Sequence, residues 1–207
     1  VEQRTQQIEQ LLKQKDEFIN QLGHDLKNPL GPLINLIPII EKHTTNEKDK
    51  EILYVIQRNV GYMKNLVEKT LELARLNSPN TTLSKKTLNL YDVIYQIITQ
   101  NKYLLKEKQI KISLSFAKSL TVHADKLRLE ELFTNLLNNA IKYSQENGEI
   151  IIQASQLKEM VTISIQDTGI GMSTEQLDHV FDEFYKADES RHDFDSSGLG
   201  MAICKRI

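Results

Sequence analysis

Several features that would mark particular classes of protein are scarce in this sequence. Its 207 residues include one cysteine, Cys204, which excludes a disulfide framework and a cysteine-based metal cluster. No apolar run approaches the roughly 20 residues that a membrane-spanning helix needs. The formal net charge is −2, so there is no electrostatic case for binding nucleic acid. These absences favour a cytoplasmic chain without membrane contact of its own, and leave open membrane anchoring of a longer parent.

The first 76 residues carry apolar side chains at the alternating spacing of three and four that marks one helical face. In a first expected helix these positions are Ile19, Leu22, Leu26, Pro29, Leu33, Leu36 and Ile40. A polar turn at 43–46, with Thr45 or Asn46 as the cap, leads into a second helix of the same kind. Since one such helical hairpin buries both apolar stripes poorly, we predict a homodimer that forms a four-helix bundle.

A change in pattern follows a polar linker at 77–82. Strands are expected at 110–116, 150–154 and 161–166, and helices at 91–108 and 127–144. The sequence thus predicts an α+β chain: the hairpin domain at 1–76, then an α/β sandwich domain at 83–207 with a mixed sheet and helices on one face. The chain does not begin with Met and stops inside an expected helix, so we expect a fragment whose second domain is incomplete at its C-terminus.

His24 occupies a position of the first expected helix that points away from the apolar seam. Taken alone, it is most simply an ordinary exposed histidine. However, Asp25 follows directly and Asn28 lies one turn further on the same face. A neutral imidazole nitrogen is a good phosphoryl acceptor near pH 7, and an adjacent carboxylate can hold the opposite ring N–H and take up the proton. Pro29 frees a helical carbonyl beside this site and favours local bending.

The expected helix at 127–144 carries an unusual polar row. Asn135 and Asn139 stand four residues apart on one face, although asparagine is a mediocre helix former. A solvated face is one interpretation. The other is a Mg²⁺ site, because Mg²⁺ takes oxygen ligands and keeps waters and substrate phosphates around it. Lys142 at the same helix end can meet a phosphate, and Tyr143 can stack on a base.

Two glycine-containing segments extend this pattern. An expected strand ends at Asp167 and leads into Gly169 and Gly171, where the backbone could approach a ligand closely. A Gly-x-Gly segment is weak evidence by itself, because it is more often a simple turn. A second one, Gly198-Leu199-Gly200, begins an expected helix, and helix N-termini bind anions. The polar stretch between them, 185–197, is typical of a mobile loop.

Together these segments resemble the catalytic core of sensor histidine kinases. Residues 18–30 resemble the H box, in which a histidine precedes an acidic residue and, further on, a Thr or Asn and Pro-Leu. The segments 135–142, 167–171, 181–184 and 198–200 resemble, in order, the N box, the first glycine box, the F box and the second glycine box. These four belong to the ATP-binding domain that such kinases share with gyrase and Hsp90-type proteins. The resemblance extends from about residue 10 to the C-terminus.

The resemblance implies a protein-histidine kinase of a two-component system. His24 would accept the γ-phosphoryl group of Mg-ATP and pass it to an aspartate in the receiver domain of a response regulator. Asp25 would be the base, and Asn28 would support dephosphorylation of the regulator.

The resemblance also implies a set of nucleotide contacts. Asn139 would bind Mg²⁺, Lys142 and Tyr143 would contact the nucleotide, and Asp167 would recognise adenine. The remaining expected ATP-site residues are Asn135, Gly169, Gly171, Gly198, Leu199 and Gly200, with Arg191 of the loop either reaching a phosphate or simply solvated.

Two alternatives remain. An ATPase of the same superfamily would need a general-base glutamate four residues before the Mg²⁺ asparagine, where this chain has Asn135, which cannot deprotonate water. A dimeric signalling scaffold with a vestigial nucleotide site is the non-enzymatic alternative, and the intact His24, Asn139 and Asp167 speak against it.

Overall fold

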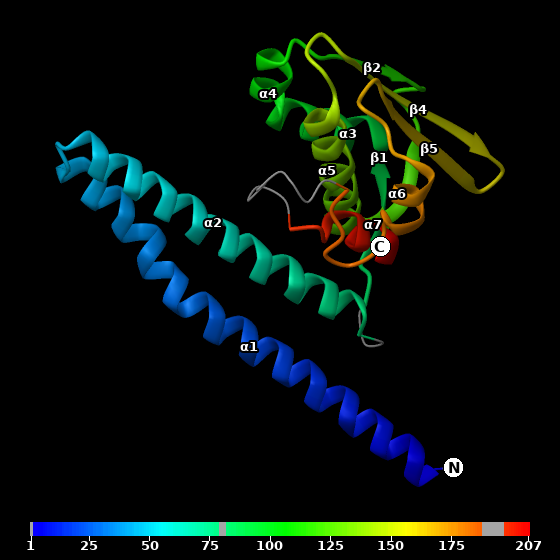
Figure 1. Cartoon of the computed structure of the whole chain (residues 1–207). Coiled ribbons are helices and arrows are strands. Elements are labelled where there is room, and N and C mark those ends of the chain that lie inside the picture. Colours follow the sequence, from blue (N-terminus) through cyan, green and yellow to red (C-terminus); the bar gives the residue numbers. More distant parts are fainter. Residues whose placement is uncertain (1, 79–81, 188–196) are drawn as a thin grey trace. The chain divides into compact units, whose positions relative to one another are not determined.

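A computed structural model describes residues 2–78, 82–187 and 197–207 (Figure 1). The chain divides into two compact units. The first, here called the hairpin unit, contains residues 1–81 and 182–206. The second, the sheet unit, contains residues 82–181 and residue 207. The predicted domain limits, 1–76 and 83–207, therefore stay a prediction.

The hairpin unit is built on two long antiparallel helices, α1 (Glu2–His43) and α2 (Glu47–Leu76). Of the two residues expected to cap α2, Thr45 and Asn46, the cap is Asn46: its side chain accepts a hydrogen bond from the Lys48 N–H at 3.0 Å. Between the helices, Leu30, Ile37 and Val60 are buried, and Ile34, Leu53 and Val67 pack against them. The three prolines at 29, 32 and 38 all lie inside α1, which continues past each of them.

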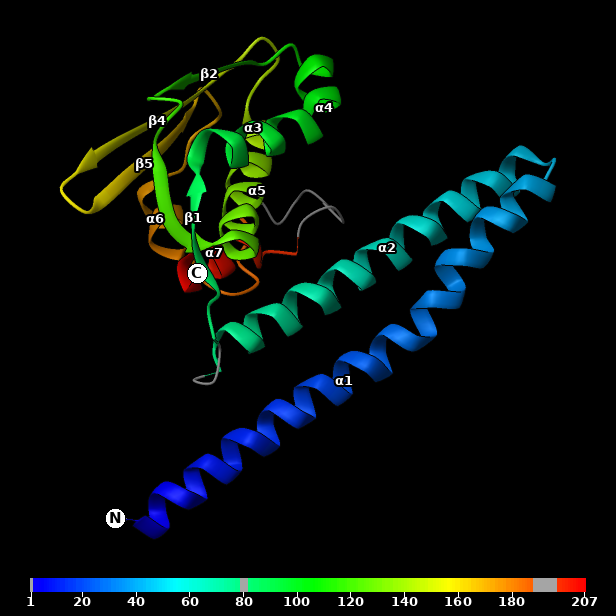
Figure 2. The same cartoon turned by 180° about the vertical axis from the view of Figure 1, so that it is seen from behind.

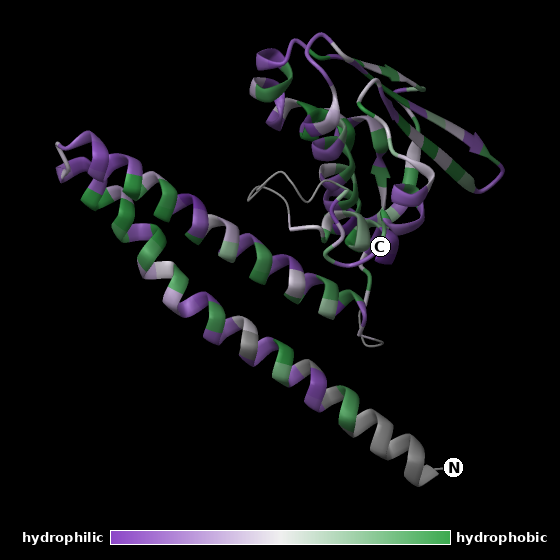
Figure 3. Ribbon diagram, in the orientation of Figure 1, coloured by the Kyte–Doolittle hydropathy of each residue, from purple (hydrophilic) through white to green (hydrophobic). Residues whose placement is uncertain are grey.

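Most of the predicted apolar seam stays exposed in the single chain. Leu26, Leu33, Leu36 and Ile40 keep between 43% and 52% of their surface accessible, and Ile56 and Met63 of α2 are similarly open. Figure 3 shows apolar bands recurring along both helices. The hairpin thus buries Leu30 and Ile37 internally and leaves an apolar stripe beside them, as the prediction of a four-helix bundle requires.

A short C-terminal helix, α7 (Gly200–Arg206), also belongs to the hairpin unit. Leu199, Ala202 and Ile203 are buried against Leu73 of α2. The apolar residues of this segment recur at spacings of three and one, so they share one face of a two-turn helix. This face, rather than helix propensity, accounts for the order of such a short element.

The sheet unit contains two small sheets and the helices that cover them. Its elements are β1 (Lys85–Asn89), α3 (Leu90–Gln100), α4 (Lys102–Glu107), β2 (Lys111–Ser115), β3 (Thr121–Asp125), α5 (Lys126–Tyr143), β4 (Glu149–Leu157), β5 (Met160–Asp167) and α6 (Thr174–His179). β2 pairs parallel with β4, and β4 pairs antiparallel with β5, so the larger sheet is mixed as predicted. β1 and β3 form a separate antiparallel pair.

The core of the sheet unit lies between its helices and strands (Figures 1 and 2). Leu90, Ile94, Leu137, Ile150 and Ile152 are its most fully buried side chains, contributed by α3, α5 and β4. In β5, Val161, Ile163 and Ile165 pack against this core, whereas Thr162 and Ser164 between them are exposed. One face of β5 therefore packs against the core that α3 and α5 contribute to, and the other face is exposed, as expected for a sheet with helices on one face.

Some elements of the sheet unit differ from the sequence-based expectation. The helix expected at 91–108 is broken at Asn101, whose side chain donates to the Ile97 carbonyl at 3.0 Å and ends α3. Asparagine competes with the helical backbone in this way, which explains the break. The strand β3 was not expected, because its five residues stand directly before the helix signal of α5.

Among the described residues, none of the helices combines the length and the apolar character needed to cross a bilayer.

Candidate functional site: an exposed histidine and a nucleotide-type helix end

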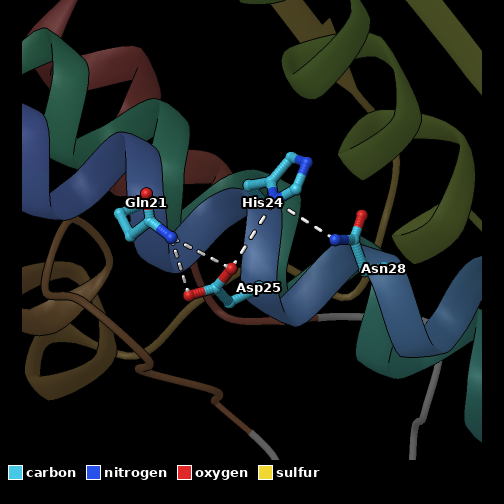
Figure 4. Close-up of polar contacts among 4 residues, drawn as sticks. All are labelled: Gln21, His24, Asp25 and Asn28. Carbon is cyan, nitrogen blue, oxygen red and sulfur yellow. Dashed lines mark hydrogen bonds and ion pairs between the residues drawn. The ribbon is translucent and has the colours of Figure 1, made fainter.

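The predicted phosphoacceptor residues come together on the exposed face of α1. The side chain of His24 is 71% exposed and that of Asp25 57%. The Asp25 carboxylate lies 3.5 Å from Nδ1 of His24, and the amide nitrogen of Asn28 lies 3.1 Å from the same atom (Figure 4). Both neighbours therefore address Nδ1, and no hydrogen bond to Nε2 is found among the described residues.

Gln21 is a fourth member of this group, and the sequence analysis missed it. Its amide nitrogen donates to both carboxylate oxygens of Asp25, at 3.1 and 3.2 Å. The spacing of four residues places the two side chains on one helical face, which was a readable signal. We call Gln21, His24, Asp25 and Asn28 the phosphoacceptor face.

Close packing of α1 on α2 supports the helix turn that carries His24. Gly23 is buried, and a Cβ there would lie 2.7 Å from a methyl group of Leu71. Arg75 donates to the Asn20 side chain at 3.2 Å, and Lys27 lies 3.9 Å from Glu68. The small residue before His24 thus lets α2 approach from behind, while the imidazole stays on the open side.

The predicted nucleotide residues of α5 gather toward its C-terminal end. Asn135, Asn139 and Lys142 are half-buried, and Tyr143 is 39% exposed. The Lys142 ammonium lies 5.3 Å from the centre of the Tyr143 ring, within the range of a cation–π contact. A cation and an open aromatic face therefore stand together where the helix ends.

Lys108 holds this helix end in place. Its ammonium group donates to the carbonyl oxygens of Ile141, Lys142 and Ser144 at 2.8, 2.8 and 3.2 Å. The last carbonyls of a helix lack intrahelical donors and carry the negative end of its dipole, so a cation there stabilises the terminus. The sequence analysis missed Lys108, because it precedes these carbonyls by 33 to 36 positions.

Asp125 fixes the opposite end of α5. Its carboxylate accepts hydrogen bonds from the backbone N–H groups of Ser84, Leu127 and Arg128. These bonds, that of Ser84 foremost, hold the pKa of Asp125 below its ordinary value of 3.8.

The first glycine segment is attached to the C-terminal end of α5 by backbone contacts. Asp167 ends β5, and its carboxylate accepts a hydrogen bond from the Gly169 N–H at 2.9 Å. The Ile170 N–H donates to the Tyr143 carbonyl at 3.3 Å, and Ser144 and Gly169 form a β-bridge. We call this region, with Lys108, the α5–β5 junction.

Gly169 has no room for a side chain. A Cβ there would lie 2.6 Å from an oxygen of Asp167 and 2.7 Å from the Tyr143 carbonyl oxygen. Gly171 has a φ of +68° and open space around its Cα. Glycine is thus required at 169 by close approach and at 171 by backbone conformation.

The second glycine segment of the predicted ATP site does not belong to the sheet unit. Gly198, Leu199 and Gly200 belong to the hairpin unit, where Gly198 has a φ of +70° and a Cβ would lie 2.6 Å from the Phe184 backbone. Leu199 is fully buried, and Gly200 begins α7. Arg191 lies outside the described residues. The predicted residues of α5 and β5 therefore lie together in the sheet unit, whereas the second glycine segment belongs to the hairpin unit.

The donor atoms on α5 suit Mg²⁺ better than a metal held by protein alone. Among the described residues, no cluster of three or more His, Cys, Asp or Glu side chains could hold a metal ion. Asn139 offers one carboxamide oxygen at a half-buried position. Mg²⁺ commonly binds through one or two protein oxygens together with water and substrate phosphates, so Asn139 fits such an ion.

Comparison with protein families accounts for both regions. The family described as His Kinase A (phospho-acceptor) domain matches residues 14–79. The family described as Histidine kinase-, DNA gyrase B-, and HSP90-like ATPase matches residues 124–207. The chain belongs to the histidine kinases. It carries the two domain types of their catalytic core, in the order predicted from the motifs.

One curated relative and two solved structures illustrate the similarity in sequence and in fold. The Sensor histidine kinase YclK of Bacillus subtilis is 30% identical over all of this chain and 44% of its own length. The structure of full-length ShkA in complex with AMPPNP superimposes with a TM-score of 0.75, covering 92% of this chain and 40% of that one at 24% identity. That of ThkA in complex with the response regulator TrrA has a TM-score of 0.62, with 92% and 53% covered at 23% identity. The chain thus spans less than half of YclK.

The motifs recognised in the sequence contain His24, Asn139 and Asp167 but not the residues that contact or support their surroundings. Gln21 contacts Asp25 on the same helix, whereas Lys108 and Asp125 hold the two ends of α5. Asp125 had a recognisable signal, an aspartate directly before an amphipathic helix.

Proposed function

We propose that this chain catalyses Mg-ATP-dependent phosphorylation of its own His24 and passes the phosphoryl group to an aspartate of a response regulator. The observation that carries the proposal is the phosphoacceptor face, where an exposed imidazole has an aspartate and an asparagine beside one nitrogen and open space at the other. An ordinary surface histidine does not require this arrangement.

The chemistry at His24 follows from the two ring nitrogens. With the proton on Nδ1 and Asp25 as its acceptor, Nε2 keeps a lone pair and points to solvent. Nε2 then forms a bond to the γ-phosphorus, the bond from that phosphorus to the bridging oxygen breaks, and ADP leaves with the electron pair. Asp25 takes up the Nδ1 proton as the product forms.

The α5–β5 junction is the proposed site for the nucleotide. The Asp167 carboxylate can accept a hydrogen bond from the adenine amine, and the Tyr143 ring offers a stacking face. Lys142 can meet a phosphate as a point charge. Mg²⁺, held in part by Asn139, would offset the phosphate charge. Gly198 and Gly200 are proposed to face the phosphates, and Arg191 is a further candidate contact.

Two partners belong to the proposal. The exposed apolar stripe of α1 and α2 supports a homodimer through the hairpin, since a second copy would bury Leu26, Leu33 and Leu36. The ThkA structure was determined with a response regulator, which supports the same class of partner here. Asn28 is proposed to assist dephosphorylation of that regulator. Use of ATP places the reaction in the cytoplasm.

Intact-mass analysis tests the proposal. After incubation with Mg-ATP, we expect the chain to gain one acid-labile phosphoryl group, and His24→Gln to gain none while still binding the nucleotide. Asn139→Ala should lose both phosphoryl gain and nucleotide binding, and phosphoryl gain that survives this change refutes the Mg²⁺ assignment.

The controls separate the alternative functions. A gain of mass in both the original chain and His24→Gln would move the acceptor elsewhere. Steady release of inorganic phosphate without a phosphoprotein would favour the ATPase. Absence of both a phosphoprotein and phosphate release would favour the scaffold.

A further inference from the structure

The four side chains of the phosphoacceptor face form one polar chain along α1 (Figure 4). Gln21 donates to the Asp25 carboxylate at 3.1 and 3.2 Å, Asp25 lies 3.5 Å from Nδ1 of His24, and Asn28 lies 3.1 Å from that same nitrogen. The contact between base and imidazole is the longest of the four. Each end of the chain therefore holds its neighbour more closely than Asp25 and His24 hold each other.

The contacts at Nδ1 compete for one proton position. A neutral imidazole nitrogen either carries a hydrogen or accepts one in the ring plane. The Asn28 amide nitrogen only donates, so its contact requires an unprotonated Nδ1 and places the ring hydrogen on Nε2. The Asp25 carboxylate only accepts, so its contact requires the hydrogen on Nδ1. The two partners thus select opposite tautomers of His24.

The tautomer selected by Asn28 is unsuited to phosphoryl transfer at Nε2. With a hydrogen on Nε2, that atom has no lone pair in the ring plane for attack on phosphorus. Gln21 adds to this effect, because it occupies both oxygens of the carboxylate that would otherwise favour the other tautomer.

We propose that Gln21 and Asn28 are positioning residues that keep the phosphoacceptor in a resting state: Gln21 holds Asp25, Asn28 fills Nδ1, and phosphorylation requires both contacts to be exchanged for one between Asp25 and Nδ1–H. The inference rests on the proposed function of His24. It adds a restraining role for Gln21, and a role for Asn28 before phosphorylation. In the exchange, Nε2 loses its proton to water and Nδ1 gains one from water, so the ring stays neutral.

The first experiment measures rates in a double-mutant cycle. Gln21→Met keeps the length and helix propensity of the side chain and removes its donor. We expect it to raise the first-order rate of phosphoryl gain about 1.5- to twofold, because paired side chains on an exposed helix face are worth a few tenths of a kcal/mol. The same change in an Asp25→Asn background should have no effect. Gln14→Met, at another exposed position of α1, is the matched control.

The second experiment observes the tautomer without ATP. Long-range ¹H–¹⁵N correlation spectra distinguish Nδ1–H from Nε2–H, and His24→Gln assigns the signal. We expect Nε2–H in the original chain and a shift toward Nδ1–H in Gln21→Met with Asn28→Ala. An Asn28 side chain turned by 180° would present its oxygen to Nδ1 and favour Nδ1–H, and finding that form in the original chain would overturn the proposal.

The two readouts also separate this inference from the proposed function. An unchanged or lower rate in Gln21→Met, or an equal effect in the Asp25→Asn background, overturns the restraining role. If no variant gains a phosphoryl group, the proposed function fails. The spectra still decide whether Gln21 and Asn28 set the tautomer.

Discussion

The phosphoacceptor face and the α5–β5 junction are built in opposite ways. On α1, the hydrogen bonds and close contacts of the phosphoacceptor face join exposed side chains no more than four residues apart. At the junction, Lys108 reaches carbonyls 33 to 36 positions away, and backbone groups of Ile170 and Tyr143 meet directly. One site is a set of side chains on a helix that forms without them, whereas the other is part of the tertiary structure.

This difference predicts how each region responds to substitution. Exposed side-chain pairs on a helix contribute a few tenths of a kcal/mol, so changes at His24 or Gln21 should alter the chemistry and leave the free energy of unfolding nearly unchanged. Changes at the junction should alter nucleotide binding and stability together.

Gly169→Ala should give the largest effect. The new methyl group would lie 2.6 to 2.7 Å from Asp167 and from the Tyr143 carbonyl oxygen, and the second of these belongs to the backbone. We expect a loss of about 2–3 kcal/mol in the free energy of unfolding, measured by urea titration followed by circular dichroism. Affinity for a non-hydrolysable ATP analogue, measured by calorimetry, should fall at least about tenfold.

Gly61→Ala is the matched change in the hairpin unit. No atom lies within 4 Å of the added Cβ, and Gly61 is an exposed position inside α2, so alanine should raise stability by about 0.5–1 kcal/mol and leave ATP binding unchanged. Equal effects of the two substitutions would contradict the contrast between the regions.

Lys108→Met should have the next largest effect. It keeps the aliphatic stem and removes the ammonium group that three carbonyls share. Loss of a donor at this half-buried helix end should cost about 1–3 kcal/mol of stability. The backbone that carries the Lys142 and Tyr143 side chains would then be less firmly held. We therefore expect KM for ATP to rise while kcat changes little.

Lys106→Met provides the comparison for this change. Lys106 is exposed in α4, so its loss should leave both stability and KM close to those of the original chain. A similar rise in KM for the two variants would show that overall charge, and not the contact with α5, is responsible.

The same contrast explains what could be predicted from the sequence. The H box, the polar row of α5 and the strand that ends at Asp167 each lie within one element, so helical and strand periodicity located those elements, and resemblance to a family identified the H box. The hairpin and the strands of the mixed sheet were predicted for the same reason, and the polar turn at 43–46 narrowed the cap to Thr45 or Asn46. The exposed apolar seam was also predicted, and Leu30 and Ile37 form the internal contact beside it.

The missed features depend on contacts between elements. Nothing in the local sequence of Lys108 indicates that its side chain binds the C-terminal carbonyls of α5, a helix that begins 18 residues later. The strand β3 is defined by pairing with β1, in which Val122 lies opposite Leu88, and not by its own five residues. The association of Leu199 and Ile203 with Leu73 likewise depends on packing over more than a hundred positions.

Asp125→Asn should give the smallest effect, and it tests the junction helix from its other end. Asparagine is nearly as good an N-cap as aspartate, so at pH 7 the variant should be only slightly less stable. The pKa of Asp125 is lowered in the folded chain, mainly by the Ser84 N–H and then by the Arg128 N–H. A lowered folded pKa means that the carboxylate stabilises the fold fully above its ordinary pKa of 3.8, and that this contribution is lost as pH falls through the lowered value.

The stability difference between the original chain and Asp125→Asn should therefore shrink below about pH 4 and vanish at still lower pH, where both side chains are neutral. Urea titrations at pH 7, 5, 4 and 3 measure that difference directly, and other carboxyl groups cancel because both proteins contain them. A constant gap between the original chain and Asp125→Asn across the series would mean that the cap acts through the geometry of its oxygen alone, and the hydrogen bond from Ser84 would then carry no charge-dependent stability.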